Sequence, residues 1–456
     1  MLSARPRFRS LRRSLHLRAI RIWLPRWRRR FFFLFGGIAV GALAVAMAAL
    51  ADRVQALFAG LHSRYPLAPF LVTPAGFALA AWLAGRYFAN AGGSGIPQVI
   101  AAHQMTEPAD RNPLVSLKVA AGKITLLLLG LACGASSGRE GPTVQVGASV
   151  MFALGRLAPH RQPGLLIAGS AAGIAAAFNA PLAGIIFGIE EMSRSFETRT
   201  SGLILGTVIA AGLTSLGLVG DYTYFGTTPD TLPFGAGWLG VPVMGVAGGL
   251  FGGIFSRILI QAGRGFPGAV GRAVKGRPIA FAAICGFGVA VCGAYAAGSI
   301  FGTGYEQARA ILHGQSHLPW TFGPLKFLAT TLSSISGIPG GIFAPSLAVG
   351  AGMAQNLHVL VPATPIGVLT ILGMVSYLSG VVQAPITSFV IVSEMTENHA
   401  LVIPIMICAI LANAVSKLIH PHGVYHTLAR RYMDAPHGTL ASSPLAAKIS
   451  GPAAPR

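Results

Sequence analysis

Apolar stretches long enough to cross a lipid bilayer recur along this chain, and they limit its folds more than any other sequence feature. The clearest are residues 31–50, 67–85, 114–133, 203–219, 239–255, 279–298, 366–382 and 399–415. A helical span needs about 20 apolar residues, and backbone in contact with lipid must satisfy its hydrogen bonds internally. The chain is therefore expected to be an all-α integral membrane protein that contacts the lipid bilayer on most sides.

Other apolar segments are too short to cross the membrane alone. Residues 164–178, 182–189 and 384–393 are such segments, and glycine and proline stand next to them. Broken helices at membrane depth are tolerated where they are buried in protein or line a cavity. This pattern is typical of transporters and channels.

Basic residues cluster at the ends of apolar stretches. The formal charge is +21, from 34 basic and 13 acidic residues. Eleven arginines and no acid precede Phe31, five basic residues and no acid lie within 257–277, and Arg430-Arg431 follow the last apolar stretch. The positive-inside rule places these segments, and with them both termini, in the cytoplasm. We favour this interpretation over nucleic-acid binding, which a net positive charge would suggest in a soluble protein.

The chain is expected to have three parts and an internal repeat. Residues 1–30 form a basic cytoplasmic segment, 31–432 the membrane domain, and 433–456 a short cytoplasmic tail. A shift of 203 positions aligns 138–148 with 341–351, and five of the eleven residues are identical. A shift of 204 pairs Asn179-Ala180-Pro181 with Gln383-Ala384-Pro385. The shared order and offset predict two repeated halves, about 31–220 and 235–432.

Arg139 and Glu140 stand side by side in this apolar chain. An ionisable group at mid-bilayer costs about 2.5–3.5 kcal/mol, so it is retained where it faces protein, water or a transported ion. A permanent Arg139–Glu140 pair is the structural alternative, but adjacent residues of a helix do not face each other. Function is therefore expected around Glu140.

Three Gly-x-Pro turns each precede an apolar stretch: Gly93–Pro97, Gly138–Pro142 and Gly341–Pro345. Such a turn starts a helix with free backbone N–H groups, and the positive end of the helix dipole attracts anions there. Singly, each turn is only a helix start in a tightly packed bundle. Together they predict an anion site without a full positive charge, from which the ion can also leave.

The three motifs in this order, with Asn179–Gly184 running to Glu190-Glu191-Met192 and with Tyr425 near the C-terminus, closely resemble the CLC family of chloride channels and chloride/proton antiporters. The resemblance covers about residues 31–432. It implies inverted halves and a homodimer with one anion pathway per subunit. It also implies a multi-pass protein of a cell membrane, and the compact length suggests a bacterial inner membrane.

The resemblance also implies roles for individual residues. Ser94 and Tyr425 would donate their hydroxyls to the central anion as the inner gate, and Glu140 would be the gating glutamate that competes with the anion. The remaining anion-binding positions are Gly141, Ile342 and Phe343, and the supporting positions are Gly93, Gly95, Pro97, Arg139 and Gly341.

Glu191 matches the internal proton-accepting glutamate of the family, where passive channels commonly carry an apolar residue. Its presence favours chloride/proton exchange over a passive chloride channel. The alternative is that Glu190 and Glu191 end a helix beside Arg194 and are solvated, which we favour for Glu190. Two departures make the inner proton route less polar than expected, since Gln98 stands where the family has glutamate and Ile100 where some bacterial exchangers carry an acid.

An enzyme is the alternative from another class, because Gly134-Ala135-Ser136-Ser137-Gly138 matches the G-x-S-x-G nucleophile elbow. That elbow needs a strand-turn-helix context, and the preceding segment here is an apolar stretch of lipid type. An intramembrane hydrolase is therefore disfavoured. His420 and His422 lack carboxylate or thiol neighbours for a metal. We expect no enzyme activity, no cofactor and no metal; chloride and protons are the expected transported ions.

Overall fold

The computed structural model describes residues 7–157, 159–193, 198–220, 223–315 and 318–434, and within these ranges the chain forms helices and no strand. Six helical stretches are long and apolar enough to cross a membrane: Phe33–Arg64, Pro108–Ala132, Gly202–Val219, Ala236–Arg264, Pro278–Tyr295 and His399–Ile419. Shorter apolar helices lie at Gln162–Phe178 and Ile366–Val382. The all-α membrane class predicted from the sequence is confirmed.

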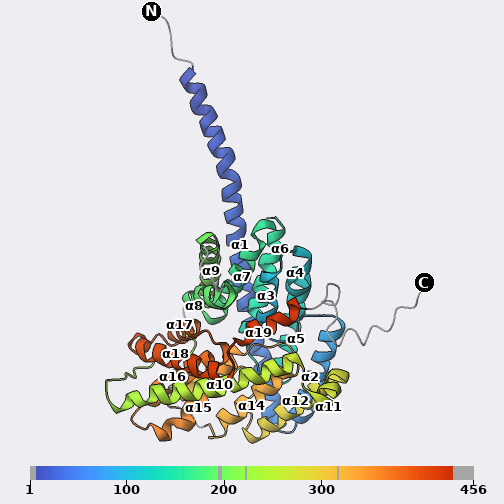
Figure 1. Ribbon diagram of the computed structural model, residues 1–456, viewed down its shortest axis with the longest axis vertical. Coiled ribbons are helices and arrows are strands. Elements are labelled where there is room, and N and C mark those ends of the chain that lie inside the picture. The colour runs from blue at the N-terminus through green and yellow to red at the C-terminus, as the bar shows by residue number, and fades with distance from the viewer. Residues whose placement is uncertain (1–6, 158, 194–197, 221–222, 316–317, 435–456) are drawn as a thin grey trace, which may run out of the picture.

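The first half of the chain contributes nine α-helices. The first, α1 (Arg7–Arg64), carries both the basic segment and the first apolar stretch, and it extends beyond the body in Figure 1. The side chains before residue 33 and the tail from residue 435 lie outside the described residues. The others are α2 (Pro69–Arg86), α3 (Ile96–Gln104), α4 (Pro108–Val115), α5 (Leu117–Ala132), α6 (Glu140–Leu154), α7 (Gln162–Phe178), α8 (Pro181–Phe187) and α9 (Thr198–Val219).

The second half contributes ten more. They are α10 (Gly240–Arg264), α11 (Gly268–Gly276), α12 (Pro278–Tyr295), α13 (Tyr305–Leu312), α14 (Phe322–Ile335), α15 (Phe343–Leu357), α16 (Ile366–Val382), α17 (Pro385–Thr396), α18 (Val402–Ile419) and α19 (Val424–Met433). In Figure 1, most helices of the first half lie in the upper part of the body and most of the second half in the lower part. α2 crosses over to pack on α12, and α19 crosses back to pack on α3.

Repeated residues produce repeated local structure in the two halves. Asn179 ends α7 and Gln383 ends α16, both with left-handed backbone at φ 52° and 60°. An alanine follows in each case, and a proline then starts the next short helix, α8 or α17. A left-handed residue stops a helix, and proline suits the first turn of the next. The Asn-Ala-Pro and Gln-Ala-Pro triplets thus explain the broken helices.

Glycines at equivalent positions allow equivalent helix crossings. A Cβ added to Gly147 on α6 would lie 2.3 Å from the carbonyl oxygen of Gly169 on α7. A Cβ added to Gly350 on α15 would lie 2.2 Å from the carbonyl oxygen of Gly373 on α16. Small residues let helix backbones approach this closely in membrane proteins. Each half therefore contains an equivalent tight glycine crossing.

Two carboxylates cap the short helices reciprocally across the repeat. Glu394, at the end of α17, accepts hydrogen bonds from the backbone N–H groups of Leu182 (3.0 Å) and Ala183 (2.6 Å) at the start of α8. Glu190, which follows α8, accepts hydrogen bonds from Ile386 (3.1 Å) and Thr387 (2.5 Å) at the start of α17. Because each helix end meets the other's start, α8 and α17 are antiparallel and the two halves are inverted.

This arrangement corrects the expectation that Glu190 is merely solvated, since its carboxylate satisfies two orphan N–H groups of a helix N-terminus. Arg194, expected beside it, lies outside the described residues.

We expect Glu394→Gln to destabilise the protein by about 1–2 kcal/mol, because two charge-assisted hydrogen bonds to the start of α8 become one neutral bond. Thermal unfolding of the purified protein in detergent measures this. Glu397→Gln is the matched control, since Glu397 lies three residues further on and is exposed. Equal unfolding temperatures for the two variants would show that the cap contributes little.

Candidate functional site

Backbone hydrogen bonds bring the three Gly-x-Pro motifs together. Gly138 and Gly341 exchange both N–H···O bonds, at 2.8 and 2.7 Å. The N–H of Gly93 donates to the carbonyl of Ile338, and the N–H of Gly340 donates to the carbonyl of Gly93, both at 3.2 Å. These contacts join the residues before α3, α6 and α15. The positive N-terminal ends of three helices therefore converge on one place.

Gly141 lies where the α6 start meets the Ser94 loop. An added Cβ at Gly141 would lie 2.4 Å from the hydroxyl oxygen of Ser94 and 3.4 Å from the Cα of Gly341. Gly95, at the cap of α3, has φ +101°, a conformation that side chains other than glycine's rarely adopt. Pro97 sits in the first turn of α3. These residue types are thus required for the close approach of the motifs.

Ser94 and Tyr425 supply two hydroxyls to this place. The Tyr425 side chain is 1% exposed, and its ring stacks on the ring of Phe343 with centroids 6.1 Å apart and planes at 14°. The hydroxyl oxygens of Ser94 and Tyr425 are both buried and make no hydrogen bond within the described chain. A buried hydroxyl without a partner is costly. Both groups are therefore available to a ligand, and as donors they suit an anion.

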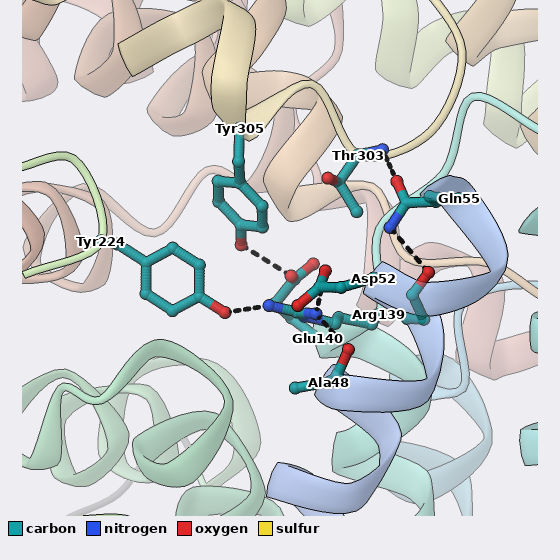
Figure 2. Close-up of polar contacts among 9 residues, drawn as sticks. Ala48, Asp52, Gln55, Arg139, Glu140, Tyr224, Thr303 and Tyr305 are labelled. Carbon is teal, nitrogen blue, oxygen red and sulfur yellow. Dashed lines mark hydrogen bonds and ion pairs between the residues drawn. The ribbon is translucent and has the colours of Figure 1, made fainter. Parts of the chain in front are cut away.

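Glu140, at the start of α6, points its carboxylate toward Tyr305 (Figure 2). The carboxylate also lies against the start of α15. The residue is fully buried. One carboxylate oxygen accepts a hydrogen bond from the hydroxyl of Tyr305 at 2.7 Å, and the other accepts one from the N–H of Ala344 at 3.4 Å. The carboxylate thus occupies the positive end of α15, which is where an anion would bind.

Arg139 forms its ion pair with Asp52 and not with Glu140. One guanidinium nitrogen donates to the Asp52 carboxylate at 2.7 Å and to the carbonyl of Ala48 at 2.8 Å. The other terminal nitrogen donates to the hydroxyl of Tyr224 (Figure 2). The guanidinium carbon lies 5.8 Å from the ring centroids of both Tyr224 and Tyr305. The two terminal nitrogens of Arg139 are therefore occupied without Glu140.

A cavity of about 1120 Å³ leads to this cluster. Its wall includes Asp52, Tyr224 and Tyr305, together with Glu306 and Arg309. Ser94, Tyr425 and Glu191 are not part of that wall. Tyr305 and the carboxylate that it binds therefore close the site on the cavity side.

Two lysines that sequence reasoning missed hold the loops at the site. Lys123 and Lys326 are both fully buried. The Lys123 ammonium donates to the carbonyls of Gly92 (3.2 Å) and Gly93 (2.9 Å), and the Lys326 ammonium donates to those of Ile300 and Gly302 (both 2.8 Å). The lysines are 203 positions apart, so the repeat offset already contained the signal.

The same repeat also contained a signal for Tyr305. Gly302-Thr303-Gly304-Tyr305 copies the pattern Gly93-Ser94-Gly95-Ile96, with a shift of 209. Tyr305 starts α13 as Ile96 starts α3. Tyr224 follows no such motif, and only the fold brings it to the site.

Glu191 lies outside the wall of this cavity and in contact with His426. It is 4% exposed and belongs to η3 (Gly188–Ser193), a π-helical turn after α8. The Nε2 atom of His426, the neighbour of Tyr425 on α19, lies 2.9 Å from the carbonyl oxygen of Glu191 and 3.7 Å from its carboxylate. Ile100 is fully buried in the apolar core, and the Gln98 amide donates to the carbonyl of Gly92 at 2.7 Å.

The nucleophile-elbow alternative has no support in the structure. The segment before Ser136 is the helix α5, where the elbow requires a strand. The Ser136 hydroxyl pairs with the hydroxyl of Thr330 at 3.0 Å, and the Ser136 N–H donates to Ser333 at 3.1 Å. Within the described chain, these contacts tie Ser136 to α14 and to no acid or base.

The geometry defines a class of protein: a membrane transport protein of two inverted halves whose broken helices bring three N-termini together at one place. The family model described as voltage gated chloride channel matches residues 76–417. The chain therefore belongs to that family, the CLC family to which its motifs pointed.

Individual relatives extend over most of the chain. The H(+)/Cl(-) exchange transporter ClcA of Klebsiella pneumoniae is 30% identical over 454 residues and covers 91% of each chain. ClcA of Salmonella paratyphi B is 30% identical over 87% of this chain and 86% of its own. The crystal structure of a slow cyanobacterial Cl-/H+ antiporter has a TM-score of 0.76 at 25% identity, covering 89% of this chain and 98% of that one. A CLC-type fluoride/proton antiporter has a TM-score of 0.74 at 22% identity, covering 87% and 96%.

We expect Arg139→Lys to destabilise the protein by about 1–3 kcal/mol, because lysine cannot reproduce the forked contacts of a buried guanidinium. Asp52→Asn is the comparison, and we expect it to cost less than about 1 kcal/mol, since the Asp52 side chain is 62% exposed to solvent. Thermal unfolding in detergent ranks the two variants. A larger loss for Asp52→Asn would mean that the ion pair, and not the fork, holds Arg139.

Proposed function

We propose that this protein exchanges chloride for protons across a cell membrane. The observation that carries the proposal is the position of the Glu140 carboxylate at the N-terminal end of α15, where it imitates a bound anion. Family membership and the exchangers among the relatives support the same conclusion.

Chloride and the Glu140 carboxylate would compete for one position. The ionised carboxylate binds Tyr305 and the start of α15 and blocks the path from the cavity. Protonation removes the negative charge that the helix end attracts, so the side chain can leave and chloride can enter. The backbone N–H groups of Ile342 and Phe343 and the hydroxyls of Ser94 and Tyr425 would then bind the ion. A chloride ion nearby in turn favours the protonated form by like-charge repulsion.

In this proposal Glu191 supplies the proton route on the side of the anion site away from the cavity. Glu191 is buried near the inner hydroxyls, and a buried carboxylate is retained in a membrane where it has a function. A passive channel needs no such group. Its presence therefore favours exchange over the passive chloride channel, and the comparisons do not favour the channel either.

The basic segments support an orientation. Arg431 on α19 donates to the carbonyl of Gly263 near the end of α10 at 3.1 Å. Two of the three basic segments therefore share one face of the molecule. By the positive-inside rule this face is cytoplasmic, so Tyr425 and Glu191 form the inner side and the cavity at Tyr305 opens outward. We propose a bacterial inner membrane and cytoplasmic termini on this basis.

We also propose that the protein is a homodimer, because it belongs to this family and because one of its surfaces combines exposed apolar side chains with half-buried carboxylates. Helices α9, α8, α17 and α18 lie in a row along the left edge of the body in Figure 1, each packed on the next. Exposed apolar side chains project from this row, including Leu205, Ile209, Ile407 and Ile410. Glu190 and Glu394 lie at its middle and are only half-buried. Carboxylates facing lipid are costly, so a second copy on this surface would shield them.

We expect Glu140→Gln to abolish proton movement and to keep chloride movement, because a neutral side chain can neither carry a proton nor compete as an anion. Purified protein in liposomes tests this under a chloride gradient without a proton gradient, with valinomycin and potassium holding the voltage at zero. Chloride-driven proton movement in the unchanged protein, lost in Glu140→Gln, establishes the exchanger. Chloride flux without proton movement in the unchanged protein would establish a passive channel.

We expect Tyr305→Phe to raise the rate of chloride flux about tenfold, because a hydrogen bond to a charged acceptor contributes about 1.5–3 kcal/mol. The Tyr305 hydroxyl donates to the Glu140 carboxylate in the blocking position, so its loss weakens the hold on that position. Chloride flux from proteoliposomes at one fixed pH measures the effect. Tyr295→Phe, at an exposed tyrosine, is the control. Equal flux rates for the two variants would show that Tyr305 does not hold the carboxylate in the blocking position.

A further inference from the structure

Glu191 needs a partner to exchange protons with the cytoplasm. Its side chain is 5% exposed, and the two nearby positions where acids were expected hold other residues. Ile100 is fully buried and apolar, and the side-chain amide of Gln98 donates a hydrogen bond to the carbonyl of Gly92. A proton entering from solvent therefore has no carboxylate on α3 to bind first.

His426 stands where that partner is required. Its ring approaches Glu191 from α19, with Nε2 at 2.9 Å from the carbonyl oxygen and 3.7 Å from the carboxylate. The His426 side chain is 13% exposed, so it is more accessible than Glu191. It also neighbours Tyr425, which keeps it on the inner side of the anion site. We propose that His426 is the proton relay between the cytoplasm and Glu191, an inference that rests on the proposed exchange function.

The proton balance of the relay is simple. Imidazole changes charge near neutral pH and has two nitrogens, so it can accept a proton on one and release a proton from the other. When a proton passes from His426 to Glu191, the Nε2–H bond of His426 breaks and an O–H bond forms on the Glu191 carboxylate. The Nδ1 atom of His426 then takes a proton from water on the cytoplasmic side. At 3.7 Å, a small side-chain rotation or one bridging water completes the path. No oxidant, reductant or other reactant is needed.

Three of the other titratable or charged groups near α19 have partners elsewhere in the molecule, and none of the others is a carboxylate. α19 packs against α3, α10 and α16. On these elements, on η3 and on α19 itself, the titratable or charged side chains besides Glu191 are His103, Glu190, Arg257, Arg264, Tyr377, Tyr425, Arg430, Arg431 and Tyr432. His103 contacts the carbonyl of Pro163, Glu190 caps α17, and Arg431 binds the carbonyl of Gly263. Glu191 is the carboxylate placed against His426.

The test uses His426→Gln in the full-length protein, reconstituted in liposomes with chloride and proton fluxes measured together. Glutamine retains an N–H that can bind the Glu191 carbonyl but cannot carry a proton. We expect proton flux to fall about tenfold or more relative to chloride flux, as for loss of a positioned acid–base group. His422→Gln is the matched control, because His422 lies just before α19 and is exposed. Coupling equal to that of the control would overturn the relay.

A second measurement separates the relay from a structural role. Imidazole added to both sides of the liposomes should restore proton flux in His426→Gln and leave the control unchanged. If His426→Gln loses both chloride and proton flux, a return of proton flux on addition of imidazole still supports the relay. If imidazole restores proton flux in neither His426→Gln nor His426→Asn, the relay is contradicted. Glu191→Val distinguishes the two proposals. Proton flux that survives Glu191→Val refutes the exchange route itself, whereas flux lost there but intact in His426→Gln refutes only the relay.

Discussion

The backbone pair between Gly138 and Gly341 is the contact on which the site depends. It joins the residues before α6 to those before α15 and so fixes two helix N-termini from opposite halves against each other. Glycine is required on both sides, because a Cβ at Gly138 would lie 3.0 Å from the Pro345 ring and one at Gly341 would lie 3.0 Å from the backbone nitrogen of Gly141. Without this approach, two positive helix ends would not share one space.

The two halves use the same motif for different tasks. Gly93-Ser94-Gly95-Ile96 and Gly302-Thr303-Gly304-Tyr305 each precede a short helix, and a buried lysine holds the carbonyls of each loop. In the first half the motif presents the unpaired Ser94 hydroxyl to the site. In the second half the last position is tyrosine, and its hydroxyl binds Glu140. In the proposed function, the inverted repeat thus yields one side ready for an anion and one side closed by a carboxylate.

Sequence reasoning reached the class, the two repeated halves and the three helix starts, because glycine-proline turns determine backbone locally and recur at a fixed offset. The inversion of the halves was implied only by the family resemblance. It missed contacts that depend on tertiary packing. Asp52 pairs with Arg139 from α1, and Tyr224 reaches it from a loop with no motif. The assignment of Glu190 to solvent failed for the same reason, since its partner helix start lies 196 positions away. Lys123 and Lys326 could have been found, because they share the offset of the repeat.

The partners of Arg139 explain how Glu140 could act as the proposed gate beside a full positive charge. A carboxylate paired with a buried guanidinium would be held too firmly to move, because breaking such a pair costs several kcal/mol. Here Asp52, the Ala48 carbonyl and Tyr224 occupy the guanidinium. Glu140 is left with two neutral donors, one of them at 3.4 Å, and neutral donors are weaker than charged ones. The charge next to the gate therefore sets the local potential without locking the carboxylate, which is the condition that competition between a proton and an anion requires.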